Sequence, residues 1–377
     1  MKITVVLGTR PEVIKLAPVI LEGRKRGHEV NVVLTGQHRD LAKPLLKFFG
    51  IEPNVDLDVM EPNQTLTGLS ARVLMKLDEH QDRVTGDCLL VQGDTTSAAM
   101  AGYWSFLKKI PLGHVEAGLR TGDLQNPFPE EANRQLIGRI ADFHFAPTAG
   151  SRKALLAEKT SPKKVSVTGN TAIDALFLTL DKIAKGAVDP QSEDGRFLAD
   201  VENWIGPKKL ILVTAHRREN IGAPLEGICK GILDLVNDSD ENYALLPVHP
   251  NPNVRETILA RLGGHPRIRL EKPLNYVSFV SLMARSSLLL TDSGGVQEEG
   301  PSLRKPILVL RKTSERPEGI RKGLAKLVGS DPKRILKEGR LALRKKQKQL
   351  TSRGPNPYGD GKAAARILKI LEKGVRR

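Results

Sequence analysis

Cysteines, aromatic residues and long apolar runs are scarce in this sequence. Its 377 residues include only two cysteines, Cys88 and Cys229, and both lie among apolar residues, as buried free thiols do. The sequence has no Cys/His spacing typical of a metal site. No apolar run approaches the roughly 18 residues that a membrane-spanning helix needs, and the stretch 1–12 is too short for the apolar region of a secretory signal. We therefore expect a cytoplasmic protein that has no membrane segment and no metal.

The charge of the chain is strongly positive. A formal net charge of +16 and a pI near 9.8 favour anionic partners, whether nucleic acid, a membrane surface or a phosphorylated small molecule. Much of the excess lies in 332–353, which is typical of a helix with a solvated basic face. Aromatic residues make up only 4% of the chain, so no run of base-stacking side chains supports nucleic acid as the partner.

Short apolar runs alternate with helical patterns along the chain. Strands that are apolar without alternation are typical of parallel sheets buried on both faces, and the intervening helices would supply the crossovers. The runs form two series separated by the polar segment 183–208, so we expect two doubly wound, Rossmann-like α/β domains that face a shared cleft. We place the first domain at 1–174 plus a C-terminal helix at about 362–377, and the second at 175–361. The expected strands are 2–8, 29–36, 88–93, 111–116, 143–147, 164–170, 210–216, 243–249, 268–274, 287–292 and 306–311.

A glycine-rich turn follows one strand of the second series. In this architecture ligands bind beyond the carboxyl ends of the strands. Ser293, Gly294 and Gly295 open a helix there, and two glycines with free N–H groups suit a phosphate. A plain strand-to-helix turn is the alternative. Glu299, one helical turn beyond Gly295, could accept hydrogen bonds from ribose hydroxyls. The spacing matches neither GxGxxG nor GxxxxGK[ST], so neither a dinucleotide fold nor a P-loop is supported.

Charged residues occupy other strand ends. Arg10 and Lys15 lie close to the start of the first helix and could hold an anion jointly, unless they form a solvated cationic turn. Asp94 follows a buried strand, and it either caps the next helix or faces the cleft. His216 and His249 hold similar places in the second series, where a structural hydrogen-bonding role is the alternative.

The stretch 114–147 gathers several charges around a turn rich in proline and glycine. Arg134 follows Glu130 by four residues, so an ion pair at a helix start would account for one of the two adjacent acids, Glu130 and Glu131. It would not account for Glu116 as well. Enzymes commonly use carboxylates in unequal environments to remove a proton from one side of a substrate and to deliver a proton to another side. The pattern therefore favours acid–base catalysis.

Taken together, these motifs resemble one family, the non-hydrolysing UDP-N-acetylglucosamine 2-epimerases. The resemblance runs from residue 3 to about residue 370, and the motifs occur in order along the chain. They are GTRPEVIKLAP (8–18), TGQHR (35–39), QGDTTS (92–97), HVEAGLRTGD (114–123), PFPEEANR (127–134), TGNTAIDA (168–175), TAHRREN (214–220), LTDSGGVQEEGPSLRKPILVLR (290–311), TSERPEG (313–319) and NPYGDGKAAARI (356–367).

The resemblance implies a fold, a reaction and an assembly. The fold would be GT-B-like, with the active site between two Rossmann-like domains. The reaction would interconvert UDP-GlcNAc and UDP-ManNAc by loss of the C2 proton, elimination of UDP to 2-acetamidoglucal, and return of UDP after reprotonation on the opposite face. It would need no nicotinamide, metal or other cofactor. The resemblance also implies a homodimer and a role in surface polysaccharide synthesis.

The resemblance also assigns roles to residues. The catalytic positions would be Asp94, Glu116, Glu130, Arg134 and His216, although which carboxylate takes the C2 proton stays open. The UDP-contacting positions would be Arg10, Lys15, Ser293, Gly294, Gly295, Glu299 and Arg316, with Phe279 stacked on the uracil. Some bacterial members bind UDP-GlcNAc at a neighbouring activator site, and the matching positions here are Gln37, Glu130, Arg217 and His249. The chain departs from that pattern at Asp40 and Asn63, where some members carry Gln and Arg.

Four other functions compete with this interpretation. They are an epimerase of a modified UDP-diacetamido sugar, a hydrolysing epimerase that releases ManNAc and UDP, a GT-B glycosyltransferase, and a basic protein that binds nucleic acid or a membrane surface. The hydrolysing form usually carries a fused kinase, which is absent here. A transferase would need an acceptor cleft and has little use for three clustered acids.

Overall fold

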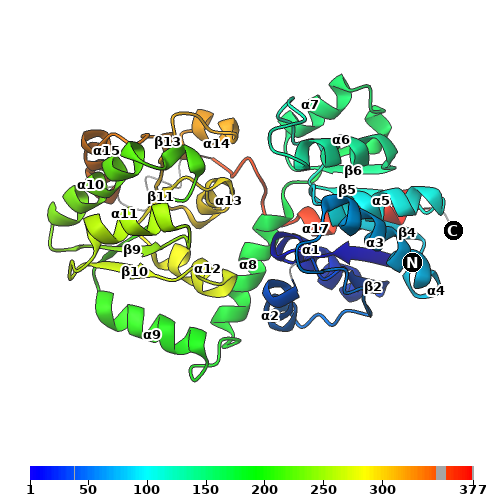
Figure 1. Cartoon of the computed structure of the whole chain (residues 1–377), viewed down its shortest axis with the longest axis horizontal. Coiled ribbons are helices and arrows are strands. Elements are labelled where there is room, and N and C mark those ends of the chain that lie inside the picture. Colours follow the sequence, from blue (N-terminus) through cyan, green and yellow to red (C-terminus); the bar gives the residue numbers. More distant parts are fainter. Residues whose placement is uncertain (38, 345–353, 376–377) are drawn as a thin grey trace. The chain divides into compact units, whose positions relative to one another are not determined.

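The structure, a computed structural model, describes residues 1–37, 39–344 and 354–375 and contains two compact units (Figure 1). Unit 1 consists of Met1–Leu178 and Tyr358–Arg377, and unit 2 consists of Thr179–Pro357. The chain passes from unit 1 to unit 2 within one helix, α8 (Thr171–Ala184). Each unit is built around its own parallel sheet.

Unit 1 contains a seven-stranded sheet in the order β3-β2-β1-β4-β5-β6-β7. Its longer strands are runs of Val, Ile and Leu that are buried along almost their whole length, as expected for a sheet covered by helices on both faces. The strands are β1 (Lys2–Leu7), β2 (Glu29–Leu34), β3 (Val55–Asp56), β4 (Cys88–Gln92), β5 (Leu112–Val115), β6 (Phe143–Ala146) and β7 (Val165–Val167). The other helices are α1 (Arg10–Lys25), α2 (Arg39–Phe49), α3 (Leu66–Glu79), α4 (Gln81–Val84), α5 (Thr96–Leu107), α6 (Glu130–Ile140), α7 (Ala149–Ala157) and α17 (Ala363–Gly374).

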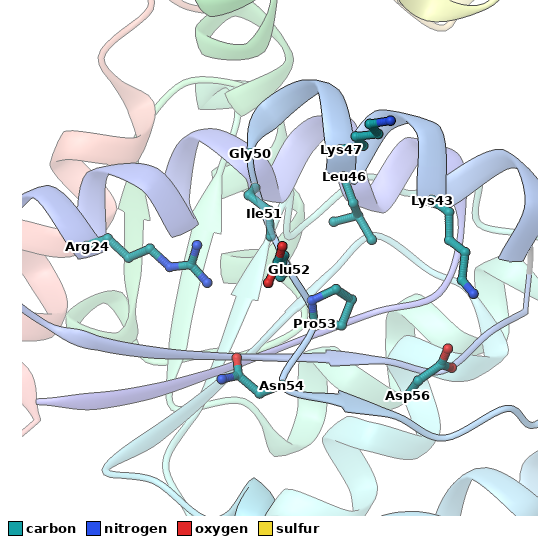
Figure 2. Close-up of a pocket in the computed structure, with 10 residues that line it drawn as sticks. All are labelled: Arg24, Lys43, Leu46, Lys47, Gly50, Ile51, Glu52, Pro53, Asn54 and Asp56. Atoms are coloured by element: carbon teal, nitrogen blue, oxygen red, sulfur yellow. The ribbon is translucent and has the colours of Figure 1, made fainter.

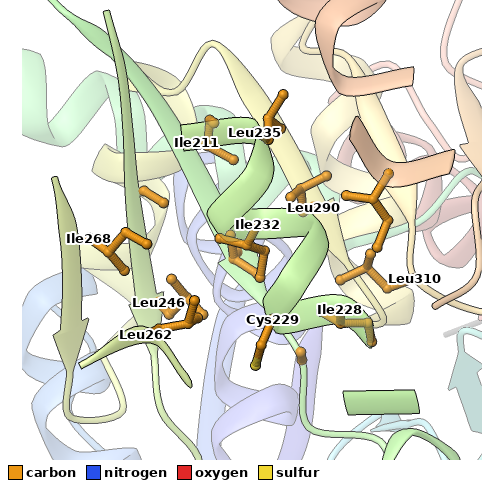
Figure 3. Packing of buried hydrophobic residues seen from close by; sticks show 14 of the residues in the cluster. Ile211, Ile228, Cys229, Ile232, Leu235, Leu246, Leu262, Ile268, Leu290 and Leu310 are labelled. Carbon is orange, nitrogen blue, oxygen red and sulfur yellow. The ribbon is translucent and has the colours of Figure 1, made fainter. Parts of the chain in front are cut away.

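Unit 2 contains a six-stranded sheet in the order β10-β9-β8-β11-β12-β13. Its core packs α10 against the sheet through Ile228, Ile232 and Leu235, which meet strand residues such as Ile211 and Leu290 (Figure 3). The strands are β8 (Lys209–Thr214), β9 (Asn242–Pro247), β10 (Ile268–Glu271), β11 (Leu288–Thr291), β12 (Ile307–Val309) and β13 (Ala325–Leu327). The helices are α9 (Glu193–Ile205), α10 (Ala223–Asn237), α11 (Pro252–Leu262), α12 (Tyr276–Arg285), α13 (Gly294–Glu299), α14 (Pro317–Arg321) and α15 (Pro332–Arg344).

The two doubly wound parallel sheets confirm the fold class expected from the sequence. In each sheet the strand order reverses once, between β1 and β4 in unit 1 and between β8 and β11 in unit 2. Two adjacent crossovers leave in opposite directions at such a reversal and open a crevice at the carboxyl ends of the strands. Residues that follow these four strands are therefore the ones most exposed to a ligand.

Three elements differ from the expectation. Strands β3 and β13 were not predicted, because two or three residues with an exposed Asp56 or Lys326 among them leave no apolar run to detect. The segment 183–208 contains a helix, α9, which begins where the Ser192 side chain accepts a hydrogen bond from Gly195 N at 3.0 Å. The basic helix expected over 332–353 is present as α15 up to Arg344, and residues 345–353 lie outside the described residues.

The C-terminal helix α17 (red in Figure 1) belongs to unit 1 and packs against α1. The backbone N–H groups of Ala363 and Ala364, at its first turn, donate to the buried Asp174 carboxylate of α8 at 3.2 and 2.9 Å. At its other end, Glu372 accepts from Arg26 at 3.2 Å. No helix in the described part of the chain is both long and apolar enough to cross a membrane.

Candidate active site

The turn after β1 is fixed by a buried acid, Glu12. Its carboxylate accepts hydrogen bonds from Gly8 N at 2.9 Å, from Thr9 N at 2.6 Å and from the Thr9 hydroxyl at 2.8 Å. The Thr95 hydroxyl, beyond the neighbouring strand β4, donates to its other oxygen at 2.6 Å. Burial raises the pKa of Glu12, although these four bonds oppose the shift. Glu12 thus ties together the two turns at the reversal of strand order.

Asp94 follows β4 and faces an arginine of α6. Its carboxylate accepts from Arg134 Nε at 2.7 Å, and its backbone carbonyl accepts from the Asn133 side chain at 2.9 Å. The alternative that Asp94 caps the next helix is wrong, because the Thr95 side chain makes that cap by accepting from Ala98 N at 3.0 Å. Burial raises the pKa of Asp94; the Glu116 charge adds to the shift, while Arg134 and Lys15 oppose it. Asp94 and Glu116 are therefore close enough to interact electrostatically.

Glu116 follows β5 in an uncommon backbone conformation, with φ at 65°. A non-glycine residue with positive φ is unfavourable, and such residues gather at functional sites. Both Lys15 and the Gln92 side chain donate to its carboxylate. The cation of α1, the helix after β1, is thereby held against an acid at the end of β5, two strands along the sheet from β1.

The adjacent acids at the start of α6 have opposite environments. Glu131 is fully buried and accepts hydrogen bonds from Thr121 N at 3.1 Å, from Arg134 at 3.1 Å and from Gln135 at 3.1 Å. Burial acts to raise the pKa of Glu131, but the hydrogen bonds outweigh it and lower the pKa. In contrast, Glu130 Oε2 is buried and accepts no hydrogen bond from a described residue.

This arrangement corrects the ion pair expected from spacing. Arg134 binds Glu131, three residues before it, and Asp94, rather than Glu130, which lies four residues before it. The guanidinium fork holds two carboxylates at once, so a helix-start ion pair does account for Glu131. Glu130 is left with a buried oxygen that accepts no hydrogen bond from the described part of the chain.

In unit 2, a buried aspartate holds the loop after β8. Asp292, directly after β11, accepts hydrogen bonds from the backbone N–H groups of His216 and Arg217, both at 2.8 Å. His216 carries a half-exposed ring whose Nδ1 lies 3.3 Å from Asp292 Oδ1. Burial lowers the pKa of His216; Arg217 and His249 lower it further, while Asp292 opposes them. The rings of His216 and His249 are stacked with centroids 6.0 Å apart.

The glycine-rich turn continues from Asp292. Ser293 is the N-cap of α13, and its side chain makes no capping hydrogen bond. Gly294 lies against the Arg316 guanidinium, where an added Cβ would come within 3.4 Å of that group. Arg316 in turn donates to the buried Glu298, a residue that the sequence reasoning passed over in favour of Glu299. The turn thus combines an open helix start with an arginine held over it.

The structure brings the predicted site residues together in two groups, one in each unit. In unit 1, Asp94, Glu116, Arg134 and Lys15 are linked through ion pairs and electrostatic contacts, and Arg10 and Glu130 stand at the starts of α1 and α6. Gln37 accepts from the Ser97 hydroxyl at 2.7 Å, next to the Asp94 turn. In unit 2, one set consists of His216, Arg217 and His249. A second set, beside Asp292, consists of Ser293, Gly294, Gly295 and Arg316. Glu299 is buried at the end of α13, and Phe279 is half-buried in α12.

Glu12 and Asp292 were not assigned roles from the sequence. The signal for Glu12 was present, because Thr9 followed three residues later by Glu12 is a capping box. Asp292 has no comparable signal, since its partners His216 and Arg217 lie about 75 residues away in the sequence.

Cavities also occur away from these residues. One of about 750 Å³ lies in unit 1, between α2 and the segment that leads into β3; three basic residues and two acids line it, and none of the predicted site residues does (Figure 2). A second cavity, of about 640 Å³, lies beside β12 and β13 in unit 2. Within the described ranges, no group of three or more His, Cys, Asp or Glu side chains is arranged to hold a metal ion.

Comparisons with known proteins agree on one family. The sequence profile described as "UDP-N-acetylglucosamine 2-epimerase" matches residues 21–372. The UDP-N-acetylglucosamine 2-epimerase of Escherichia coli (strain K12) is 45% identical over 375 residues, 99% of this chain and 98% of its own length. The enzyme of the same name from Bacillus subtilis (strain 168) is 43% identical over 98% of this chain and 95% of its own. The crystal structure of UDP-GlcNAc 2-epimerase from Neisseria meningitidis bound to UDP-GlcNAc has a TM-score of 0.86 at 42% identity, covering 99% of this chain and all of that one.

The contrast between Glu130 and Glu131 can be tested by unfolding. We expect Glu131→Ala to lower the free energy of unfolding by about 2 kcal/mol, because buried N–H donors and Arg134 lose their acceptor. Glu130→Ala should change it by less than about 0.5 kcal/mol, since no described donor loses a partner. Urea unfolding of both variants would measure the difference. Equal losses would show that Glu130 is also structural.

Proposed function

Because the chain belongs to the UDP-N-acetylglucosamine 2-epimerase family, we propose that it interconverts UDP-GlcNAc and UDP-ManNAc at C2 of the sugar. The observation that carries the proposal is the linked set of Asp94, Glu116 and Arg134 in a chain from this family. Glu130 lies in the same unit with an oxygen that no described residue binds. The Neisseria meningitidis relative was crystallised with UDP-GlcNAc, which supports the same nucleotide sugar as the substrate here.

The reaction needs a positioned base and stabilisation of a leaving diphosphate. A C2 proton is poorly acidic, so its removal and the departure of UDP become feasible only where negative charge that develops on UDP is matched by fixed cations and dipoles. Reprotonation of the 2-acetamidoglucal intermediate on its other face, followed by return of UDP, inverts C2. Protons are thus exchanged at C2, and no net redox change occurs.

The unit 1 acids suit the two proton transfers. Asp94, whose pKa is raised by burial and by Glu116, takes up a proton more readily than an ordinary aspartate. Glu116 accepts hydrogen bonds from Lys15 and Gln92, which hold its side chain in a fixed position. Glu130 has an oxygen available to the sugar. We propose that two of these three acids serve opposite faces of C2, and that Arg134 holds Asp94 in place.

The unit 2 residues suit the nucleotide. Ser293, Gly294 and Gly295 would bind the diphosphate through the open start of α13, and Arg316 would add a cation beside it. His216 would stabilise the departing UDP. Phe279 would stack on the uracil and Glu299 would bind the ribose, while Arg10 and Lys15 of unit 1 would complete the phosphate contacts.

Three further features follow from the family resemblance. Gln37, Arg217 and His249 are proposed to bind a second UDP-GlcNAc as an activator, together with Glu130. The enzyme is proposed to act in the cytoplasm and to supply a precursor of surface polysaccharides. It is also proposed to form a homodimer.

Incubation with UDP-GlcNAc in D2O tests the reaction directly. We expect two UDP-sugars that both carry deuterium at C2, with little free UDP, because the C2 proton exchanges with solvent during elimination and return. NMR of the sugar region would measure both. Accumulation of ManNAc and UDP would identify a hydrolase instead, and absence of turnover would favour an epimerase of a modified sugar or a transferase.

Glu130→Gln separates catalysis from folding. The amide keeps the size of the side chain but cannot take or deliver a proton as a carboxylate does, so kcat should fall by roughly 10²-fold or more. Thermal unfolding should stay close to wild type, since Glu130 Oε2 has no donor to lose among the residues that the structure describes. A variant that retains full kcat would remove Glu130 from the mechanism.

Exposed apolar side chains on three neighbouring helices of unit 1 support the homodimer. They are Met75 on α3, Tyr103, Phe106 and Leu107 on α5, and Leu136 on α6. Surfaces of this kind are typical of protein interfaces. Leu107→Glu should convert a dimer to a monomer in sedimentation velocity, because a buried charge without a partner disfavours association. The control is Leu259→Glu, at an exposed leucine of α11 in unit 2, which should leave the dimer intact. A monomeric wild type would contradict the proposal.

A further inference from the structure

Asp292 is a buried carboxylate whose two oxygens have different partners. The side chain has no exposed surface. One oxygen, Oδ2, accepts from His216 N at 2.8 Å, from Arg217 N at 2.8 Å and from the Asn220 amide at 3.0 Å. Three donors saturate that oxygen and fix the orientation of the carboxylate group.

The other oxygen, Oδ1, faces the imidazole ring of His216. It lies 3.3 Å from Nδ1, within ion-pair distance, and accepts no hydrogen bond from any described residue. A buried carboxylate oxygen without a donor is costly, and the ring nitrogen beside it can supply the missing proton. Nε2 lies on the opposite side of the five-membered ring and so points away from Asp292.

We propose that Asp292 is a positioning residue for His216, which holds the neutral ring in the tautomer with its proton on Nδ1 and leaves Nε2 to meet the substrate. The inference rests on the proposed function for the identity of that substrate, a UDP-sugar. Asp292 would act on the reaction only through His216, since Oδ2 is bound by three protein donors and Oδ1 lies beside the ring.

The tautomer decides what His216 can do for the departing diphosphate. With the Nδ1 proton directed at Asp292, Nε2 is the only ring atom that gains or loses a proton during the cycle. The protonated ring can donate from Nε2 to a phosphate oxygen of UDP, and the Asp292 charge stabilises that cation. Arg217 and His249, the other charged or titratable groups that act on the ring, oppose protonation. The negative charge of Asp292 therefore counteracts the effect of Arg217 and His249 on protonation of the His216 ring.

The tautomer can be measured in the wild-type protein without substrate. Nitrogen-15 NMR of histidine-labelled protein above the pKa of His216 distinguishes a protonated Nδ1 from a protonated Nε2, and the His216→Gln variant identifies the resonances. We expect a protonated Nδ1. A neutral ring protonated on Nε2 would overturn the proposal, whatever the activity of the enzyme.

Asp292→Asn gives the second test. Only the amide oxygen can accept from the backbone N–H groups of His216 and Arg217, so the amide nitrogen must face Nδ1 and donate to it. The neutral ring should then carry its proton on Nε2, and its pKa should fall because a stabilising negative charge has gone. We expect a kcat about 100-fold lower and a basic limb of the pH–kcat profile that moves to lower pH, because the protonated ring persists only below its lowered pKa.

Asn220→Ala is the matched control. It removes one donor to Oδ2 and a hydrogen bond to Leu310 O at 3.2 Å, so it disturbs the same loop without changing what faces Nδ1. Its tautomer and pH profile should match wild type even if stability falls. An unchanged tautomer and profile in Asp292→Asn, or the same shift in Asn220→Ala, would reduce Asp292 to a structural residue. A wild-type enzyme without epimerase activity would instead refute the proposed function, and the NMR result would still stand.

Discussion

Both units depend on a buried carboxylate that binds the turns where the strand order reverses. Glu12 accepts from the turn after β1 and from Thr95 after β4, and Asp292 accepts from the loop after β8 at the end of β11. Crevices at such reversals are formed by loops, whose backbone groups have no ladder to bind them. An acid that accepts hydrogen bonds from several N–H or O–H donors of these loops holds them at the ends of the strands.

The same division between fixed and available acids recurs at the start of α6. Glu131 is bound by backbone N–H groups, Gln135 and Arg134, whereas its neighbour Glu130 keeps an oxygen to which no described residue donates. A catalytic carboxylate needs both a fixed position and an oxygen that can reach the substrate. Here Arg134 joins the fixed Glu131 to Asp94, so the supporting acid also orients a proposed reacting one.

The sequence was a better guide to the two β-sheets than to the side-chain contacts of the candidate site. Buried runs such as those at β1 and β8 identify parallel strands by themselves, and the reversal points follow from the order of strands and helices. Very short strands such as β3 and β13 have no such pattern. For the site, the residue types at strand ends were sufficient to select Asp94, Glu116 and His216. The partners were not readable, because Arg134 reaches Asp94 and Asp292 reaches His216 through tertiary structure alone. Spacing along a helix wrongly favoured Glu130 as the partner of Arg134.

Unit 1 is assembled from both ends of the chain, since α17 packs on α1 and is held by Asp174 and Arg26. A ribosome therefore releases the last helix of the first domain only after it has made the whole of the second. Until then the apolar face of the first domain that α17 covers stays exposed, because Ile367, Leu368 and Leu371 of α17 have not yet been synthesised. Unit 2 is continuous and can fold as it emerges, so the domain encoded first is the one completed last.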